Sequence, residues 1–300
     1  MTRLLVLGRQ GQLASALAAT PLPTGWTAGF AGRDALDLTQ PETIAAFLDA
    51  EGPDVVINTA AYTAVDAAEA DEAGATALNA TAPQALAEAC HGRGRLLIHL
   101  STDYVFSGDG DRPHGEDDPI GPLNAYGRTK AAGERGVLAA DPDALVARTA
   151  WLLSPQSSFV RAILSRLKAG EGASVVDDQF GNPTHAGDLA AGLIQVAAAR
   201  LAGVGAGGVL HMAGSQAASW YDLAVGLAAP LRLQQQIQPI ASTAFGAKAV
   251  RPYNSRISVI RLKKVYDIAL RPWTAWITET AQLGLIGAPK GVETRQQSGD

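Results

Sequence analysis

The feature that most constrains the fold is a regular alternation of short apolar runs with helical stretches in the first half of the chain. Runs with the length of a strand occur at residues 3–8, 26–32, 54–61, 95–106 and 143–151. Helical stretches lie between them, one beginning near Gln12 and another within the Ala-rich segment NATAPQALAEAC. Strands continuous in Val, Ile and Leu that alternate with helices indicate a parallel sheet covered on both faces. The predicted fold class is therefore α/β with a doubly wound sheet.

Composition and charge exclude several classes of protein. The chain has 300 residues, so one large domain or two unequal ones is expected. A net charge of -5 without a basic tract argues against a nucleic-acid partner. No apolar run is long enough for a signal peptide or a membrane span. Cys90 is the only cysteine, which excludes an internal disulfide and a Cys-rich zinc site and favours the cytoplasm.

A glycine-containing turn follows the first predicted strand. In LGRQGQLA, Gly8 would allow a tight turn, and Gly11 would let the backbone approach a pyrophosphate at the start of a helix. The motif is weak alone, but its place at the start of an alternating chain favours a Rossmann-like dinucleotide site. After the second strand, Asp34 suits a free ribose hydroxyl and Arg33 suits a 2′-phosphate. Both NADPH and NADH remain open, with a slight preference for NADPH.

The segment NAYGRTK places Tyr126 and Lys130 four residues apart, so that they are neighbours on one helix face. A tyrosine lying over a lysine stem would explain this spacing without any function. However, the preceding strand breaks into the polar residues Ser101, Thr102 and Asp103, and ligands bind at such carboxyl ends of strands. The three polar residues therefore favour a site.

Reduction of a ketone by hydride explains this set of side chains. Charge developing on the carbonyl oxygen must be met by a hydrogen-bond donor and then by a proton. A nearby ammonium would stabilise the phenolate of Tyr126, and lowering its pKa by roughly three units is worth about 4 kcal/mol. Thr102 would hold the substrate oxygen in line with the phenol.

Together these motifs resemble the dTDP-4-dehydrorhamnose reductase family of the extended short-chain dehydrogenase/reductase superfamily. The resemblance covers almost the whole chain, and STDYVF and YGRTKAAGE are shared with other sugar-nucleotide enzymes. NTAAYTAVDAAE and RPYNSR are more specific to this family. The similar segments, in order, are LGRQGQLA, DLTQPE, PDVVINTAAYTAVDAAE, LNATAP, STDYVFSGDG, PLNAYGRTKAAGE, RTAWLL, DQFGNPT and RPYNSR.

The resemblance implies a role for each residue at a matching position. Tyr126 would be the proton donor, Lys130 its modulator and a contact of the nicotinamide ribose, and Thr102 the hydroxyl that orients the carbonyl. Further cofactor contacts would be Gly11, Gln12 and Leu13 at the pyrophosphate, Asp37 and Leu38 by the adenine, and Ala60, Ala61 and Tyr62 along the cofactor. The sugar nucleotide would face Thr102, Asp103 and Trp151. The chain departs from the family at Ala14, in the glycine turn, and at Tyr62, where a histidine is common.

Two arginines in RPYNSR are further candidates for the substrate site. Guanidinium groups suit phosphate oxygens, so Arg251 and Arg256 could grip the substrate diphosphate. Two solvent-facing arginines in a loop would explain the same residues equally well without the resemblance. His99, within a predicted strand, is interpreted as a core residue with satisfied hydrogen bonds.

The resemblance implies reduction of dTDP-4-dehydro-L-rhamnose to dTDP-L-rhamnose by NADPH or NADH. A reductase or epimerase of another sugar nucleotide is the first alternative. A cofactor-binding regulatory subunit without activity is the second, disfavoured by the intact threonine, tyrosine and lysine. A homodimer with Mg²⁺ at its contact is also considered, although no metal ligands are identified in the sequence.

Two helix starts and a division into lobes complete the predictions. Thr39 with Glu42, and Ser219 with Asp222, have capping-box spacing. After Trp151 the alternation loosens, which suggests a smaller, partly interleaved lobe. We expect a dinucleotide-binding domain at residues 1–152 and about 186–213, a substrate-binding lobe at 153–185 and 214–287, and a mobile tail at 288–300.

Overall fold

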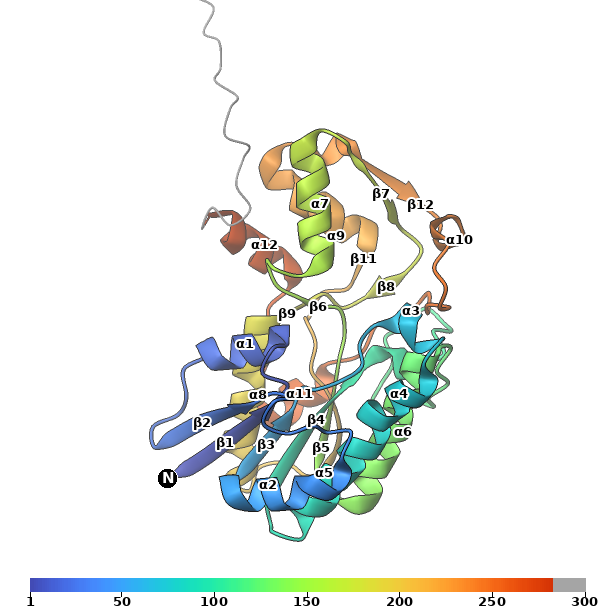
Figure 1. The fold of residues 1–300 in the computed structure, drawn as a ribbon. Coiled ribbons are helices and arrows are strands. Elements are labelled where there is room, and N and C mark those ends of the chain that lie inside the picture. Colours follow the sequence, from blue (N-terminus) through green and yellow to red (C-terminus); the bar gives the residue numbers. More distant parts are fainter. Residues whose placement is uncertain (283–300) are drawn as a thin grey trace, which may run out of the picture.

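The structure is a computed structural model that describes residues 1–282, and its centre is a six-stranded sheet (Figure 1). The strand order is β10-β5-β4-β3-β1-β2, and all neighbouring strands are parallel. Because β2 and β3 lie on opposite sides of β1, the strand order reverses there, and ligands bind at such a point. The strands are β1 (Thr2–Leu7), β2 (Trp26–Ala31), β3 (Val55–Asn58), β4 (Leu96–Thr102), β5 (Leu145–Thr149) and β10 (Gly208–His211).

Helices cover both faces of this sheet, which confirms the predicted doubly wound α/β fold. Alternate residues of each strand face opposite cores: Leu4 and Val6 pack on one side, Leu5 and Leu7 on the other. Burial of each such side chain stabilises the fold by about 1.5–3 kcal/mol. The first face is covered by α1 (Gln12–Ala19) and α8 (Ala186–Leu201), the second by α2 (Ile44–Glu51), α5 (Ala82–His91) and α6 (Ala125–Ala140).

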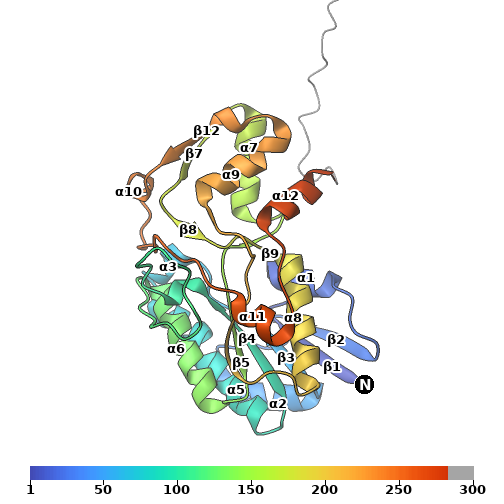
Figure 2. The same ribbon diagram turned by 180° about the vertical axis from the view of Figure 1, so that it is seen from behind.

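A smaller lobe lies beyond the carboxyl ends of the strands (Figures 1 and 2). It has its own apolar core, in which Leu164, Leu227 and Trp276 from three helices are buried. Its strands β7 and β12 pair in parallel, whereas β8 and β11 pair antiparallel. The lobe contains α7 (Ser158–Ala169), β7 (Ala173–Val176), β8 (Phe180–Gly181), β11 (Ala218–Ser219), α9 (Trp220–Ala228), β12 (Ile237–Ile240) and α12 (Trp273–Gln282).

Short elements connect the two parts. A parallel pair, β6 and β9, joins the end of the sheet region to the smaller lobe. One 3-10 turn, Asp103–Val105, follows β4 directly. The remaining α-helices and β-strands are α3 (Val65–Ala68), α4 (Glu72–Thr76), β6 (Leu152–Leu153), β9 (Thr184–His185), α10 (Ser242–Phe245) and α11 (Ile260–Tyr266).

We propose the division into lobes that the sequence suggests, with one segment reconsidered. β10 pairs with β5, and α8 packs on the sheet, which favours counting residues 186–213 with the sheet. Within 214–287, however, Leu262, Ile268 and Leu270 are buried in the core under the sheet. Residues 260–270 therefore pack with the larger part. The tail predicted at 288–300 lies outside the described residues.

The two predicted capping boxes have opposite outcomes. Ser219 caps α9 reciprocally with Asp222, as predicted. The box at Thr39 is wrong: its hydroxyl and its backbone N–H both donate to Asp37, and α2 begins only at Ile44 after a 3-10 turn. Within residues 1–282, no helix is both long enough and apolar enough to cross a membrane.

Candidate active site

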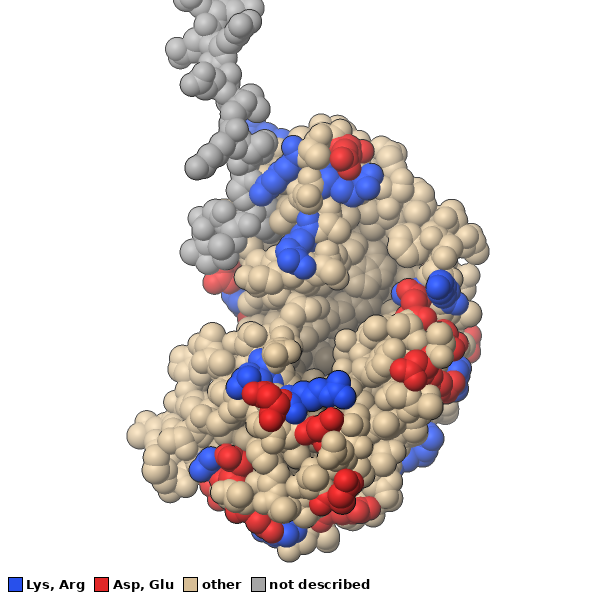
Figure 3. Space-filling view, viewed as in Figure 1, with Lys and Arg blue, Asp and Glu red and all other residues tan. Residues whose placement is uncertain are grey.

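A cleft of about 900 Å³ opens at the carboxyl edge of the sheet, beneath the smaller lobe. Figure 3 shows the hollow between the two parts, with acidic and basic side chains along its lower rim. Of the site residues predicted from the sequence, all but two line this cleft. The predicted residues that line the cleft are Gly8, Gly11, Gln12, Leu13, Arg33, Asp37, Leu38, Ala60, Ala61, Tyr62, Thr102, Asp103, Tyr126, Lys130 and Trp151.

The turn between β1 and α1 brings backbone close to the cleft at its two glycines. Gly8 has φ +96°, and a Cβ there would lie 2.7 Å from the Thr59 hydroxyl and 2.9 Å from the Ala60 nitrogen. Gly11 precedes α1 without a side-chain cap, so the first N–H groups of this eight-residue helix have no side-chain acceptor there. Free N–H groups at a helix start next to a glycine turn fit the pyrophosphate of a dinucleotide.

The end of β2 supplies a charged edge of the same wall. Arg33 Nε lies 3.5 Å from Asp37 Oδ2, and the Arg33 side chain is 80% exposed. Hydrogen bonds from Thr39, and more weakly the guanidinium of Arg33, lower the pKa of Asp37. Nearby, Arg9 donates to Asp34 at 3.0 Å. An arginine as exposed as Arg33 can reach a phosphate in the cleft.

Tyr126 lies in the first turn of α6, on the opposite wall. Asn124 caps this helix by accepting a hydrogen bond from Gly127 N at 2.8 Å. A Cβ on Gly127 would lie 2.2 Å from the Tyr104 carbonyl, so this glycine allows α6 to approach the end of β4. The Tyr104 and Tyr126 rings meet edge to face at 5.9 Å.

Burial raises the pKa of Tyr126 to about 12, a hydrogen bond with Thr102 opposes the rise, and Asp103 adds to it. This differs from the expected lowering by Lys130. The lysine is turned towards β4: Nζ donates to the Leu100 carbonyl at 2.6 Å and lies 3.2 Å from His99 Nε2. In the ligand-free protein, the phenol therefore keeps its proton.

Lys130 itself is buried, with 2% of its surface exposed. Burial lowers its pKa to about 8, and the carboxylate of Glu134 opposes this. Glu134 is already shared, because it accepts from Arg148 at 2.7 and 2.8 Å and from Ser101. The lysine can therefore change its charge near neutral pH.

Thr102 and Asp103 form the floor of the cleft beside Tyr126. Thr102 Oγ1 donates to Asp103 Oδ1 at 3.0 Å and accepts from Tyr104 N at 3.2 Å. Asp103 Oδ2 has no hydrogen-bond partner within the described part of the chain. Burial raises the pKa of Asp103 to about 7. Hydrogen bonds with Ser255 and Thr102 oppose this rise.

Trp151 forms the wall next to the smaller lobe. Its backbone has φ +42°, unusual for a bulky residue, and its ring stacks on Trp220 at 3.7 Å with 7° between the planes. A Cβ on Gly181 would lie 2.4 Å from the Trp151 ring, so a glycine is needed there. Trp220 was not predicted, although its position directly after the Ser219 cap places it at a helix start.

Arg251 and Arg256 are the two predicted residues that do not line the cleft. Arg251 forms an ion pair with Asp66, at 2.9 and 3.2 Å. Arg256 donates to Asn254 Oδ1 and to the Asp111 carbonyl, and it lies over the Phe180 ring. Both guanidinium groups have protein partners, and their contact with a diphosphate stays a prediction.

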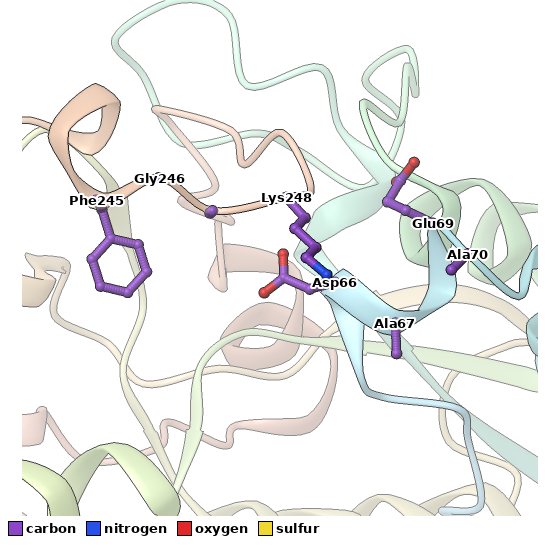
Figure 4. A pocket seen from close by; sticks show the side chains of 8 residues that line it. Asp66, Ala67, Glu69, Ala70, Phe245, Gly246 and Lys248 are labelled. Atoms are coloured by element: carbon purple, nitrogen blue, oxygen red, sulfur yellow. The ribbon is translucent and has the colours of Figure 1, made fainter.

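Asp66 also lines a second, more open pocket at the edge of α3. Figure 4 shows the Lys248 side chain extending towards Asp66, with Phe245 on the far side of the pocket. The backbone N–H of Ala249 donates to Asp66 at 2.9 Å, so the loop before RPYNSR is tied to α3. Asp66 thus anchors this loop, and the Arg251 guanidinium with it, next to α3.

Two buried residues behind Lys130 were not predicted as site residues. His99 has hydrogen-bond partners at both ring nitrogens, Asn58 and Lys130, which confirms the interpretation of a satisfied core histidine. Asn58 ends the otherwise apolar segment VVIN, a signal similar to the STD break in β4. Among residues 1–282, no three His, Cys, Asp or Glu side chains are arranged to hold a metal ion.

Comparison with known proteins gives consistent matches over nearly the full length. A probable dTDP-4,6-dihydroxy-2-methyloxan-3-one 4-ketoreductase of Streptomyces antibioticus is 42% identical, covering 92% of this chain and 94% of that protein. A dTDP-4-dehydrorhamnose reductase of Streptomyces griseus is 41% identical, with 96% of each covered.

A solved structure agrees with this. The crystal structure of dTDP-4-dehydrorhamnose reductase from Bacillus anthracis, in complex with NADP, matches with a TM-score of 0.85 and 29% identity. The match covers 93% of this chain and 98% of that one. The family described as the RmlD substrate binding domain matches residues 1–284. The chain therefore belongs to the RmlD substrate binding domain family.

Proposed function

We propose that this protein reduces dTDP-4-dehydro-L-rhamnose to dTDP-L-rhamnose with NADPH. The observation that carries the proposal is the meeting of Thr102, Tyr126 and Lys130 in one cleft with the glycine turn. Relatives at about 40% identity are named for this reaction. The Bacillus anthracis relative binds NADP, and the exposed Arg33 suits a 2′-phosphate.

The turn at Gly8 fits a nicotinamide dinucleotide site, because only a residue without Cβ lets the turn pack this closely against Thr59 and Ala60 after β3. The turn from Gly8 to Leu13 would hold the pyrophosphate, and Asp37 and Leu38 would lie by the adenine. Ala60, Ala61 and Tyr62 would follow the cofactor towards the reacting end. The bound cofactor supplies a hydride to the substrate carbonyl carbon.

Tyr126 donates its phenolic proton to the carbonyl oxygen of the substrate. Its raised pKa keeps the proton in place until charge develops on that oxygen. The Thr102 hydroxyl orients the carbonyl, and Asp103 lies next to the sugar nucleotide. A charge on Lys130 stabilises the phenolate left behind.

Turnover of the purified protein tests this proposal directly. NADPH should be oxidised only when dTDP-4-dehydro-L-rhamnose is present, and NADPH carrying deuterium at the transferred position should leave deuterium at C4 of the product sugar. Mass spectrometry and NMR of the product measure this. NADH in place of NADPH tests the cofactor preference. Unchanged NADPH in the presence of the keto-sugar would contradict the proposal.

A second candidate is a 4-ketoreductase acting on another dTDP-deoxysugar. It is favoured by the 42% identity to the Streptomyces antibioticus protein, which is named as a probable ketoreductase of such a substrate. Comparing kcat/KM for both keto-sugars separates the two. An epimerase would interconvert sugars without net oxidation of NADPH, and a regulatory subunit would show no turnover.

We also propose a cytoplasmic location and a homodimer, which fractionation and sedimentation would test. The buried, single Cys90 suits a reducing compartment. Magnesium is left out of the proposal, because no ligand cluster is found within residues 1–282.

A further inference from the structure

A line of hydrogen bonds behind the active site connects β3, β4 and α6. Ala60 N donates to Asn58 Oδ1 at 3.1 Å, and Asn58 Nδ2 lies 3.1 Å from His99 Nδ1. His99 Nε2 lies 3.2 Å from Lys130 Nζ, which donates to the Leu100 carbonyl at 2.6 Å. Asn58, His99 and Lys130 are each at most 2% exposed.

The first bonds in this line fix the position of the imidazole proton. A backbone N–H can only donate, so the Asn58 oxygen faces Ala60 and the amide nitrogen faces His99. An amide nitrogen can also only donate, so Nδ1 of His99 must accept. Burial holds the pKa of His99 well below its usual value, and a charged Lys130 would lower it further, so the ring is neutral in either charge state of the lysine. Its single proton is therefore on Nε2, facing Lys130.

This tautomer has a consequence for the lysine. An ammonium carries only N–H donors, so a charged Lys130 would oppose the His99 N–H across 3.2 Å. An uncharged amine has a lone pair for His99 and still donates to Leu100. We propose that Asn58 and His99 are positioning residues that set the charge of Lys130, by holding His99 in the Nε2–H tautomer, which favours the uncharged amine in the ligand-free protein.

The other charged groups around Lys130 do not by themselves fix its charge. On its own helix, Tyr126 lies one turn before it and Glu134 one turn after it, and from β5 Arg148 pairs with Glu134. Glu134 favours the ammonium and burial disfavours it, with burial the larger, so the pKa of Lys130 falls to about 8. Because this lies within about one unit of neutrality, one hydrogen bond can change the charged fraction severalfold.

The inference deepens the proposed function and rests on it only for a kinetic readout. The fraction of Lys130 that is uncharged before substrate binds must take up a proton before it can acidify Tyr126. Turnover should then fall as the pH rises through the pKa of Lys130.

The tautomer can be measured without any turnover. In ligand-free protein with 15N-labelled histidine, long-range proton–nitrogen NMR distinguishes a protonated ring nitrogen from a bare one, and a His99→Gln variant assigns the signals. The expected result is a proton on Nε2 alone between pH 6 and pH 9. A proton on Nδ1, or on both nitrogens, would overturn the proposal.

Asn58→Asp tests the coupling to the lysine. A carboxylate still accepts from Ala60 N, but it also accepts from His99 Nδ1–H, which leaves Nε2 bare for an ammonium. His99 NMR should show the proton moved to Nδ1. The midpoint of the Lys130 titration, followed by 13C NMR at Cε, should rise by about one unit or more.

The added negative charge alone would also raise that midpoint, so the same substitution is made in a His99→Leu background. There the rise should be less than half as large. Equal rises in both backgrounds would overturn the proposal, and if the double variant does not fold, the tautomer in Asn58→Asp decides. The alkaline limb of kcat should move with the midpoint. If the wild type had no reductase activity, the proposed function would fail while both NMR results still decided the inference.

Discussion

The two walls of the cleft are built in different ways. The wall formed by the turn from Gly8 to Leu13 and by the end of β2 offers backbone at a tight turn, and its charged residue Arg33 is exposed to solvent. The opposite wall, formed by β4 and α6, offers side chains: Thr102, Asp103 and Lys130 are all buried. Backbone N–H groups can bind a ligand without the cost of burying a charged side chain. Buried ionisable side chains, in contrast, have shifted pKa values that suit them to proton transfer. The first wall is suited to binding and the second to chemistry.

The largest effect is expected on the second wall, from Tyr126→Phe. The ring and its contact with Tyr104 are kept, but the proton donor is lost. General acid catalysis contributes about 10²–10⁴-fold, so kcat should fall by that factor while KM for NADPH stays nearly constant. Steady-state kinetics of NADPH oxidation measures both. Tyr266→Phe, on α11 away from the cleft, is the matched control and should keep full activity. Wild-type turnover by Tyr126→Phe would refute the assignment of the proton donor.

Asp103→Asn tests how much the buried carboxyl group of Asp103, on the same wall, destabilises the fold when it is ionised. The folded-state pKa of about 7 lies above the ordinary 3.8, so the native protein binds more protons than the unfolded chain between these values. Stability should therefore fall as the pH rises from about 4 to 7, by up to about 4 kcal/mol relative to Asp103→Asn. Urea unfolding of both proteins at pH 5 and pH 8 measures this.

Asp109→Asn, at an exposed position, is the control, and its free energy of unfolding should depend on pH as that of the wild type does. A wild type whose stability changed with pH in parallel with Asp103→Asn would show that Asp103 is not strained in the native state.

Gly8→Ala tests the backbone wall, with a smaller effect. A Cβ at φ +96° meets the Thr59 hydroxyl and the Ala60 nitrogen, so we expect a loss of about 1–3 kcal/mol in the free energy of unfolding and a higher KM for NADPH. Gly25→Ala is a matched control, because Gly25 also has a positive φ of +81° but has nothing within 4 Å. It should show only the backbone strain, with KM unchanged. Equal effects of the two substitutions would argue against a crowded turn at Gly8.

Some features of the fold and the cleft could be predicted from the sequence, and others could not. The strand alternation and the glycine turn are local patterns, so the fold and the turn at Gly8 could be located from them. Other predicted cleft residues, such as Asp37 and Ala60, were located only through the family resemblance. Pairings between distant residues could not be predicted in this way. Arg251 forms its ion pair with Asp66, 185 positions away, and Asn58 reaches His99 across 41 positions. Thr39 matched a capping pattern, but Asp37 accepts both of its hydrogen bonds, and a spacing rule does not include that competitor.

The smallest effect is expected where the smaller lobe meets the cleft. Trp220 stacks on Trp151 at 3.7 Å, and such aromatic pairs contribute about 0.5–1.5 kcal/mol beyond area burial. Trp220→Ala should therefore raise KM for the sugar nucleotide by about three- to tenfold while KM for NADPH stays constant, because Trp151 loses the ring that orients it. Trp220→Phe keeps an aromatic partner for Trp151, so its KM for the sugar nucleotide should lie between those of the wild type and Trp220→Ala. If KM for NADPH rose equally, the stack would serve the backbone wall as well, and the separation of binding and chemistry between the walls would not extend to the smaller lobe.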